Sequence, residues 1–593
     1  MIQRILSYVS VSLIVLNLII SLLFIVATIY KIGFDMSAMH QSMINMIDRS
    51  ATITFTILMT LELIANKHSL KTRGLVVELI IYALLLIALL PIIGTYTNKT
   101  LLLLSDLGSK SSFYIPILLV ISVHNILRWL ASTMNKKSNP TVLMAISFFV
   151  IIIIGTAMLM MPNATYYGIS TVDALFVSTS AVCVTGLTPV DFAQTFTQLG
   201  QIITLILIQI GGLGFMTITS FFGLFFMSNS TIGSQIMVKD MLSNDSLNSL
   251  LKTLLYIFLF TFIIEFIGAA SIFLIIRDKL QLPLNEQIYL SIFHAISAFC
   301  NAGFSTIEGG LTNIAVQKLN GVYLTIASLI VLGGIGFPII ANFRTILGYY
   351  YQKIIYRLSL KNHLHIKKTH LLNLNTKIVL STTFILIVSG AVSIAFLEWN
   401  NAFASMSISQ KLTQSIFCSV TPRTAGFNNI DTTLLSNATL IITIILMWIG
   451  GASQSTAGGV KINAFTTALL HVFASARGKR RLEIFGREIP QDSISRSNIA
   501  IIASLIVITI SLIILTVTHP NISPSRLLFE IISALGTVGL SMNTTPLLSD
   551  FGKIIITLLM FSGRIGILSI VLCVLRKSKA TQIRYPKDNI IIN

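Results

Sequence analysis

Long apolar runs alternate with shorter polar segments along most of this chain of 593 residues. A helix needs about 20 apolar residues to cross the hydrocarbon core of a bilayer, so runs of this length predict transmembrane helices. The first four runs cover approximately residues 5–30, 51–65, 75–96 and 113–134. We therefore predict an all-α polytopic membrane protein in which residues 1–137 form an N-terminal bundle of four transmembrane helices.

Beyond this bundle, one local pattern occurs four times. A short apolar segment ends at a glycine, which Leu or Phe and then a small polar residue follow, and a second glycine cluster lies near the end of the next apolar run. The first glycines of the four copies are Gly186, Gly303, Gly426 and Gly539. Their even spacing of about 120 residues indicates an internal repeat of outer helix, pore loop and inner helix. We predict the repeats at residues 138–228, 250–341, 376–473 and 499–575, with basic cytoplasmic segments at 342–375, 474–498 and 576–593.

The broken helices indicate a pore or a binding site. In the third copy an apolar helix stops at Pro422, a loop surrounds Gly426, and the next apolar helix ends at Gly450. Hydrocarbon cannot satisfy free backbone N–H and C=O groups, so irregular backbone at membrane depth must be buried in protein or line water. Glycine frees the backbone to turn its carbonyls toward an ion, and four such loops make a ring. The residues predicted to bind a cation through their backbone carbonyls are Thr185, Gly186, Ala302, Gly303, Ala425, Gly426, Val538 and Gly539.

Polar residues mark where the pore helices begin. Ser170 followed by Asp173 is typical of a capping box and opens the first pore helix. Asn285 is the expected cap in the second repeat, and Ser523 with Pro524 begins the helix of the fourth. Each pore helix then points its negative carbonyl end at its loop, which favours a cation there.

The break in the third inner helix is longer than the other three. It places small and polar residues between two glycine pairs, and each glycine costs a helix roughly 1 kcal/mol relative to Ala. We predict a movable gating loop below the ring, formed by Gly450, Gly451, Ala452, Ser453, Gln454, Ser455, Thr456, Ala457, Gly458, Gly459 and Lys461. Arg564, in the corresponding break of the fourth repeat, needs acceptors at membrane depth, and carbonyls and hydroxyls of the loop could supply them. The alternative is that Arg564 only packs between repeats and fixes their arrangement.

Composition and charge agree with a membrane protein and narrow its class. Hydrophobic residues make up 54% of the chain, charged residues 10%, and the mean hydropathy is +0.86. A net charge of +19 is typical of nucleic-acid binding, but no nucleic-acid motif accompanies it and the basic residues lie between apolar runs. By the positive-inside rule, these residues predict a multi-pass protein of the cell membrane with both termini in the cytoplasm.

Other candidate chemistry is sparse. We find no P-loop, metal-ligand spacing or nucleophile elbow, so we expect neither an enzyme nor a cofactor held by this chain. Glu265 is the only acid that we place well inside a predicted span, and it is either an ion-coupling site or a carboxyl packed against neighbouring helices. Three acids near the pore loops are expected to concentrate cations at the mouth: Asp191, Glu308 and Asp431.

Several motifs resemble one known group of proteins. The four pore glycines lie in V-C-V-T-G-L-T, A-F-C-N-A-G-F-S, S-V-T-P-R-T-A-G-F-N and S-A-L-G-T-V-G-L-S. The inner helices end in I-Q-I-G-G-L-G-F, G-G-A-S-Q-S-T-A-G-G-V-K and F-S-G-R-I-G. Over about residues 140–580 the chain resembles the Trk/Ktr/HKT superfamily, and it is most similar to the potassium-translocating membrane subunits of bacterial Ktr systems.

The resemblance implies potassium uptake through four pseudo-fourfold repeats around one central pore. It implies that K⁺ is the transported ion and binds at the carbonyls of the selectivity filter. It also implies a homodimer in membrane lipid and a cytoplasmic ring of regulatory subunits, and a nucleotide is expected only on those subunits. The resemblance leaves open whether Na⁺ activates transport. Na⁺ transporters of this superfamily typically carry Ser at the position of Gly186, so the glycine favours K⁺. The alternative is a Na⁺-selective or Na⁺/H⁺-coupled carrier, although a coupled carrier would be expected to use inverted repeats and intramembrane carboxylates.

Overall fold

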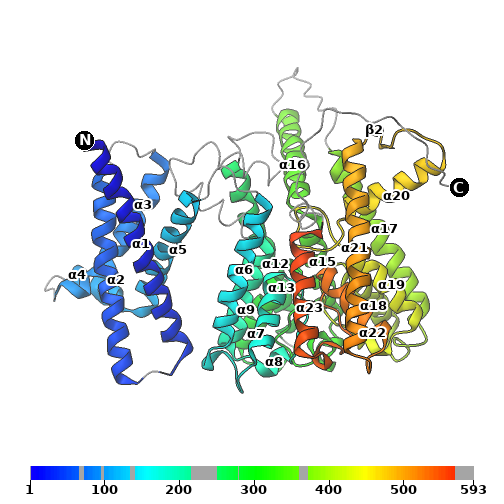
Figure 1. Ribbon diagram of the computed structural model, residues 1–593, viewed down its shortest axis with the longest axis horizontal. Helices are drawn as coiled ribbons and strands as arrows, with labels where there is room; N and C mark the ends of the chain where they lie inside the picture. The colour runs from blue at the N-terminus through cyan, green and yellow to red at the C-terminus, as the bar shows by residue number, and fades with distance from the viewer. Residues whose placement is uncertain are drawn as a thin grey trace.

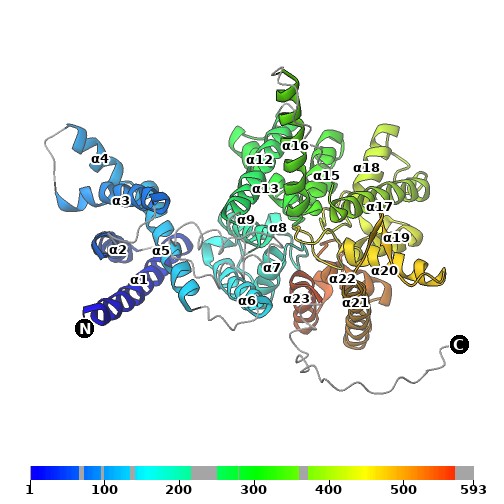
Figure 2. The same ribbon diagram turned by 90° about the horizontal axis from the view of Figure 1, so that it is seen from above.

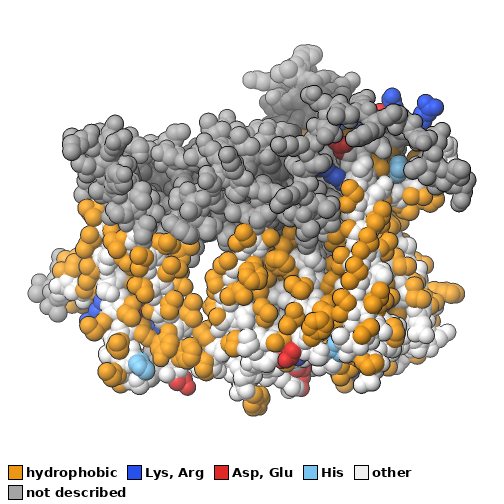
Figure 3. Space-filling model, in the orientation of Figure 1, with side chains coloured by type: hydrophobic (Ala, Val, Ile, Leu, Met, Phe, Trp, Pro, Cys, Tyr) orange, Lys and Arg blue, Asp and Glu red, His pale blue; other side chains and the backbone are white. Residues whose placement is uncertain are grey.

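The computed structural model describes residues 2–35, 37–65, 72–94, 99–133, 140–214, 250–277, 279–358 and 372–567. In these parts the chain folds into helices and one two-stranded hairpin (Figure 1), and apolar side chains cover the flanks of the helices (Figure 3). Among the described residues, four helices are long and apolar enough to cross a membrane, or six if each of two bent helix pairs is one span. This is the all-α polytopic fold that the apolar runs predict.

The N-terminal bundle stands beside the repeats, at the left of Figure 1. Its helices are α1 (Ile2–Gly33), α2 (Ala38–Ala65), α3 (Thr72–Ile93), α4 (Lys99–Ser109) and α5 (Ser111–Thr133). Four of them correspond to the predicted runs, whereas the short helix α4 was not predicted and meets α5 at an angle of 65°.

Inside this bundle, an apolar core of Phe24, Phe55 and Leu118 lies above a polar contact. Lys31 forms an ion pair with Asp48 at 3.1 Å, and the hydroxyl of Tyr114 donates to the same carboxylate at 2.9 Å. Burial of a paired charge between helices ties α1, α2 and α5 together.

Each repeat contributes an outer, a pore and an inner helix. Repeat 1 has α6 (Pro140–Leu159), α7 (Thr171–Val182) and α9 (Gln198–Leu213); repeat 2 has α12 (Leu250–Ile276), α13 (Leu284–Phe299) and α15 (Asn320–Ile335); repeat 3 has α17 (Leu374–Glu398), α18 (Ile408–Val420) and α19 (Asn437–Trp448); repeat 4 has α21 (Gln491–Thr518), α22 (Pro524–Gly536) and α23 (Asp550–Ile565). Seen from above, the repeats follow one another around a centre (Figure 2). The following predicted parts lie outside the described residues: 138–139 and 215–228 of the first repeat, 568–575 of the fourth repeat, and the tail 576–593.

A short helical turn lies at or before the start of each inner helix. These turns are α8 (Phe192–Thr195), η3 (Gly310–Thr312), α14 (Ile314–Gln317), η4 (Thr432–Leu434) and η5 (Thr545–Leu547), and a further turn, η1 (Pro162–Ala164), follows α6.

Two further helices extend the inner helices on the side away from the pore helices. Helix α16 (Phe337–Leu358) bends by 92° from α15 and projects beyond the repeats (Figures 1 and 2), and α20 (Ile462–Ala476) follows the break after α19. The strands β1 (Glu483–Ile484) and β2 (Arg487–Glu488) then pair antiparallel, with Glu483 opposite Glu488. This hairpin therefore folds within the predicted basic segment 474–498, whereas residues 359–371 of the other basic loop lie outside the description.

The helix caps test the local predictions. Ser170 caps α7 as predicted, because its hydroxyl accepts the N–H of Asp173 at 3.1 Å. Ser523 and Pro524 begin α22 as predicted, but the side chain of Ser523 makes no capping hydrogen bond. The prediction for Asn285 is wrong: α13 begins earlier, at Leu284, after Pro283. The extended backbone of Pro283 brings the chain into the helix without a side-chain cap. A capping box of Ser407 and Gln410 opens α18, and the S-x-x-Q spacing in the sequence is its signal.

Candidate functional site

The four pore loops share one unusual backbone conformation. The residue two positions before each pore glycine has a positive φ: 57° at Val184, 62° at Asn301, 71° at Thr424 and 51° at Thr537. The four glycines are also at positive φ, between 71° and 98°. Valine and threonine are branched at Cβ and strongly disfavour this region, so surrounding structure must hold the loops in it.

The pore glycines close into a ring in which each touches the next repeat. A methyl group at Gly186 would overlap the carbonyl oxygen of Ala302, and one at Gly303 would overlap that of Ala425. The same relation links Gly426 to Val538, and Gly539 back to Thr185. All eight predicted residues of the ring are therefore brought together. Only glycine permits this approach, since any Cβ would collide with a neighbouring carbonyl.

Hydrogen bonds attach each loop to the C-terminal end of its own pore helix. The N–H groups of Thr185, Ala302 and Val538 donate to serine carbonyls five residues earlier, at 2.7, 2.7 and 2.8 Å. In repeats 1 and 4 the hydroxyls of Ser180 and Ser533 also accept the N–H of the pore glycine, at 3.0 and 3.1 Å. In repeats 2 and 3 the hydroxyls of Ser297 and Thr421 instead donate to the carbonyls of Phe304 and Phe427, at 2.9 and 2.8 Å.

Glycines of the inner helices let these helices approach the pore-helix ends. Added methyl groups at Gly211, Gly333 and Gly563 would overlap the carbonyl oxygens of Val182, Phe299 and Leu535. In the third repeat the equivalent contact is internal, because a methyl group at Gly450 would overlap Gly458 of the same break. The predicted gating loop, residues 450–461, therefore occupies the place that a pore-helix end fills in the other repeats.

Backbone hydrogen bonds attach the gating loop to repeat 2. The N–H of Ala452 donates to the carbonyl of Gly334 at 3.0 Å, and the N–H of Phe337 donates to Gln454 at 3.2 Å. On the other side, a methyl group at Gly458 would overlap the side chain of Thr537 in repeat 4. The loop therefore reaches both neighbouring repeats at the level of the inner-helix breaks.

Arg564 links this loop to the remaining repeat. Its guanidinium donates one hydrogen bond to the carbonyl of Thr456 in the loop and one to the carbonyl of Gly211 in repeat 1. The expected carbonyl acceptors are therefore present. Lys461, also at this depth, donates to the carbonyl of Ala457 at 2.6 Å. A guanidinium presents several donors in a fixed plane, so one side chain can join two segments.

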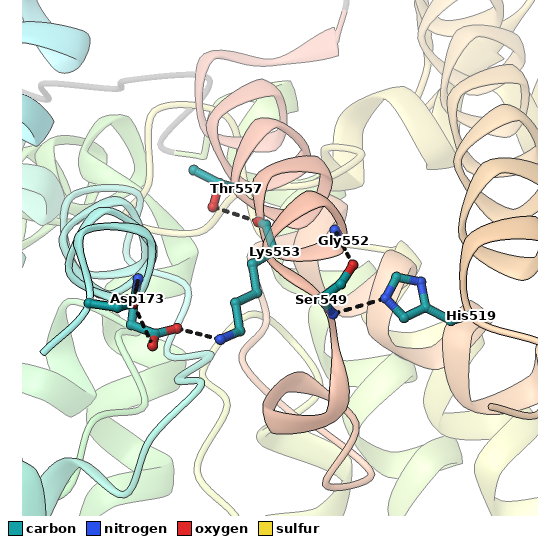
Figure 4. A network of polar contacts seen from close by, with 7 residues as sticks. Asp173, His519, Ser549, Gly552, Lys553 and Thr557 are labelled. Carbon is teal, nitrogen blue, oxygen red and sulfur yellow. Dashed lines mark hydrogen bonds and ion pairs between the residues drawn. The ribbon is translucent and has the colours of Figure 1, made fainter. Parts of the chain in front are cut away.

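A second contact between repeats 1 and 4 lies near the start of the pore helix. Lys553 of α23 forms an ion pair with Asp173 of α7 at 2.6 Å, and both side chains are largely buried (Figure 4). On the same helix, the N–H of Ser549 donates to Nε2 of His519, at the end of α21, at 2.9 Å. The chain passes directly between successive repeats but not from the fourth back to the first, so the ion pair of Lys553 and Asp173 helps to close the ring, whereas the contact of His519 with Ser549 lies within repeat 4.

The acids fall into two groups. Asp191 and Asp431 accept N–H groups of the turns that follow them, and Glu308 accepts from the side chain of Gln194; all three are exposed beside the pore loops. Glu265 is buried, and Gln209 of α9 donates to it at 3.2 Å. Its carboxyl is thus packed against neighbouring helices.

The sequence analysis missed a buried acid on a pore helix, Glu530 of α22. Its carboxylate is fully buried and accepts the hydroxyls of Ser541, at 2.9 Å, and Thr545. A signal was available, because a polar residue occupies the equivalent position of the second pore helix, His294. Among the described residues, no group of three or more metal-ligating side chains occurs.

The fold and the ring first define the class of protein: a polytopic helical membrane protein whose four pore segments surround one centre. A family model described as TrkH, cation transport protein, matches residues 109–582. The chain belongs to this family of cation transport proteins, so the predicted fold and superfamily are confirmed and the protein is a transporter rather than an enzyme.

Three known proteins show the extent of the similarity. The chain is 35% identical to the potassium/sodium uptake protein NtpJ of Enterococcus hirae, over 77% of this chain and 98% of that protein. It is 35% identical to the Ktr system potassium uptake protein B of Bacillus subtilis, over 78% and 98%. The crystal structure of the potassium transporter TrkH from Vibrio parahaemolyticus is similar in fold, with a TM-score of 0.60 at 15% identity over 85% of this chain and 97% of that one.

Proposed function

We propose that this protein takes up K⁺ across the cell membrane through a pore whose selectivity filter is the ring of loops around the four pore glycines. The observation that supports this most strongly is the closed sequence of glycine-to-carbonyl contacts from repeat 1 through repeats 2, 3 and 4 back to repeat 1. Rings of backbone carbonyls replace the hydration shell of a cation. Two hydroxyls in these loops, on Thr185 and Thr537, are buried without a partner among the described residues and add oxygen ligands beside the carbonyls.

Uptake by the purified chain in liposomes tests the proposal. Proteoliposomes loaded with K⁺ should accumulate tracer Rb⁺ with no Na⁺ or proton gradient, and external K⁺ should compete better than external Na⁺. Liposomes without protein are the control. Uptake that requires a Na⁺ or proton gradient would instead support a coupled carrier, and equal competition by both ions would support the potassium/sodium activity that the name of the Enterococcus relative states.

We further propose that residues 450–461 form the gate. The loop contacts repeats 2 and 4, and Arg564 extends its contacts to repeat 1, so the loop and this side chain connect all four repeats on one level. A fixed positive charge at this level opposes cations until the loop moves. The alternative, that Arg564 only fixes the packing of the repeats, predicts the same contacts but no change in flux when they are lost.

The next proposals concern the orientation of the chain in the membrane, its regulatory partner and its oligomeric state. Helix α16 and the hairpin lie on the edge of the molecule where α1 begins, opposite the pore helices (Figure 1), which supports a cytoplasmic N-terminus with pore loops entering from outside. The names of the Ktr system relatives support a further, regulatory component. We propose that this component is a cytoplasmic nucleotide-binding ring that docks on this edge of a homodimer of the membrane chain. Purification from cells that encode a soluble regulatory subunit should recover both; recovery of the membrane chain alone would contradict docking.

A further inference from the structure

Two pore helices carry a buried, ionisable side chain directly behind their loops. His294 and Glu530 each lie nine residues before a pore glycine, on α13 and α22, and are 1% and 0% exposed. Ser178 and Ser419 make the same contact with the outer helices of repeats 1 and 3, so the equivalent residues there are the ones just before them, Val177 and Cys418, which are also buried. The polar pair therefore belongs to repeats 2 and 4, which face each other across the ring because the contacts run in the order 1, 2, 3, 4.

In repeat 2 the imidazole holds the turn after the pore glycine. Nδ1 of His294 lies 2.9 Å from the carbonyl oxygen of Leu290, so Nδ1 carries the proton and Nε2 is an acceptor. The hydroxyl of Ser305, two residues after Gly303, then donates to Nε2 at 2.9 Å. The same hydroxyl accepts the N–H of Ile307 at 3.1 Å. The contact fixes the outer turn of the loop to the pore helix.

In repeat 4 the carboxyl group of Glu530 attaches the turn after the pore glycine to the pore helix, through two hydroxyl groups. Ser541, two residues after Gly539, donates to Glu530 at 2.9 Å, and Thr545 donates to the second oxygen. The hydroxyl of Ser541 also accepts the N–H of Thr544 at 3.3 Å. A buried carboxyl group needs partners for its oxygens, and no apolar side chain at this position could accept these hydrogen bonds.

We propose that His294 and Glu530 are positioning residues that set the carbonyl geometry of two opposite filter loops and thereby the preference for K⁺ over Na⁺. The inference rests on the filter proposed above. Repeat 3 also has a polar contact here, because Asn429 donates to Gln414 and Cys418 of α18, at 2.6 and 3.0 Å. Repeats 2 and 4 differ from it in using a histidine or a carboxyl group, which contacts the hydroxyl two residues after the pore glycine. Selectivity depends on the number and position of the coordinating carbonyls, which lie directly before each held turn.

Matched substitutions test this role. Glu530→Gln, Ser541→Ala and Ser305→Ala should each raise the ratio of Na⁺ to K⁺ permeability about fivefold, as expected when one such hydrogen bond is lost. Glu530→Gln combined with Ser541→Ala should change the ratio no more than either alone, because both remove one contact. Ser178→Ala and Ser419→Ala are the controls: these buried pore-helix hydroxyls donate outward, to the carbonyls of Ile152 and Ile387, each at 2.8 Å.

The outcomes distinguish an effect on the position of the filter carbonyls from a general loss of protein stability. The controls should lower thermal stability and leave the permeability ratio unchanged, whereas Ser305→Ala and Ser541→Ala should shift the ratio at similar stability. Folded filter variants with the wild-type ratio would overturn the inference and leave the proposed filter standing. A wild-type chain that conducts K⁺ and Na⁺ equally would overturn the filter itself. Ser305→Ala removes only one oxygen atom, so this variant still tests the inference if Glu530→Gln does not fold.

Discussion

At the scale of single residues, the ring depends on backbone conformations that few side chains allow. Val184 and Thr537 lie at positive φ although both are branched at Cβ, and each precedes a carbonyl of the ring by one residue. Such residues cost of order 1–3 kcal/mol each and persist where the surrounding structure overdetermines them. Here the serine carbonyls of the pore helices and the contact with the next repeat provide that constraint.

Gly186→Ser should admit more Na⁺ relative to K⁺. The new Cβ would overlap the carbonyl oxygen of Ala302, at a backbone φ of 94°. A left-handed backbone costs a non-glycine residue roughly 1–2 kcal/mol, and an energy of this size changes an equilibrium about 5- to 30-fold. Competition of Na⁺ with Rb⁺ uptake in proteoliposomes measures the ratio.

The control for this substitution is Gly168→Ser. Gly168 has a φ of 78°, but nothing lies within 4 Å of an added Cβ and the residue is exposed. It should keep the wild-type preference. An unchanged preference in Gly186→Ser as well would contradict the role of this glycine in selection.

At the scale of elements, the gating loop is the part that distinguishes repeat 3 from the others. Deletion of residues 452–457, or Arg564→Ala, should raise basal K⁺ flux about tenfold, because each removes charge-assisted hydrogen bonds of about 1.5–3 kcal/mol that hold the loop. Arg564→Lys keeps the charge but cannot span Thr456 and Gly211 with one planar group. Its flux should lie between those of wild type and Arg564→Ala in the same tracer assay.

The competing explanation for Arg564 makes a different prediction. If this side chain only fixes the packing of repeats 1, 3 and 4, then Arg564→Ala and the loop deletion should unfold at lower temperature and conduct no faster than wild type. Folded, assembled variants with wild-type flux would show that this loop is not the gate.

The ion pair of Asp173 and Lys553 should stabilise the junction between α7 and α23. Asp173→Asn or Lys553→Met leaves a largely buried charge without its partner and should lower the free energy of unfolding by roughly 3 kcal/mol. The double variant should lose less than the sum of the two, since it leaves no unpaired charge. Thermal unfolding in detergent measures these differences.

The matched control is an exposed ion pair, that of Arg481 and Glu488. Arg481 and Glu488 lie 3.4 Å apart, with side chains 73% and 53% exposed, and such pairs contribute roughly 0–1 kcal/mol. Arg481→Met should therefore change the unfolding temperature little. Equal losses in both pairs would mean that the contact at Lys553 does not close the ring.

At the scale of the whole molecule, the proposed pore needs no contact from the N-terminal bundle. Among the described residues, the contacts that form the ring and hold the gating loop come from positions beyond 140, and the family match begins at residue 109. Contacts between the bundle and repeat 1 include a hydrogen bond from Asn163 to the carbonyl of Ile32 at 3.4 Å and packing of Gly33 against Met161.

Deletion of residues 1–137 should therefore leave K⁺ flux intact in liposomes. We expect lower expression, because the deletion removes the contacts that the bundle makes with Met161 and Asn163, just after α6. Tracer uptake normalised to folded protein measures the effect, with the full chain as the control. Loss of flux in a well-folded truncated protein would place the bundle in the ion pathway.

The sequence by itself determined the class of fold, the four repeats and the glycines of the ring. These features are local: apolar length sets a span, and a glycine followed by a small polar residue marks each loop wherever it recurs. For the same reason the cap at Ser170 and the proline in the first turn of α22 were predictable, whereas the start of α13 shifted because Pro283 could begin the helix without a side-chain cap.

Only the tertiary structure decided which of these residues meet. The contact of Arg564 with Gly211 joins positions 353 residues apart, and that of Lys553 with Asp173 joins positions 380 apart. The buried carboxylate of Glu530 becomes meaningful only once Ser541 and Thr545 fold back onto it. Such contacts depend on how the ring closes, which no periodicity along the chain encodes, since each repeat carries its own local signals but not the position of its neighbours.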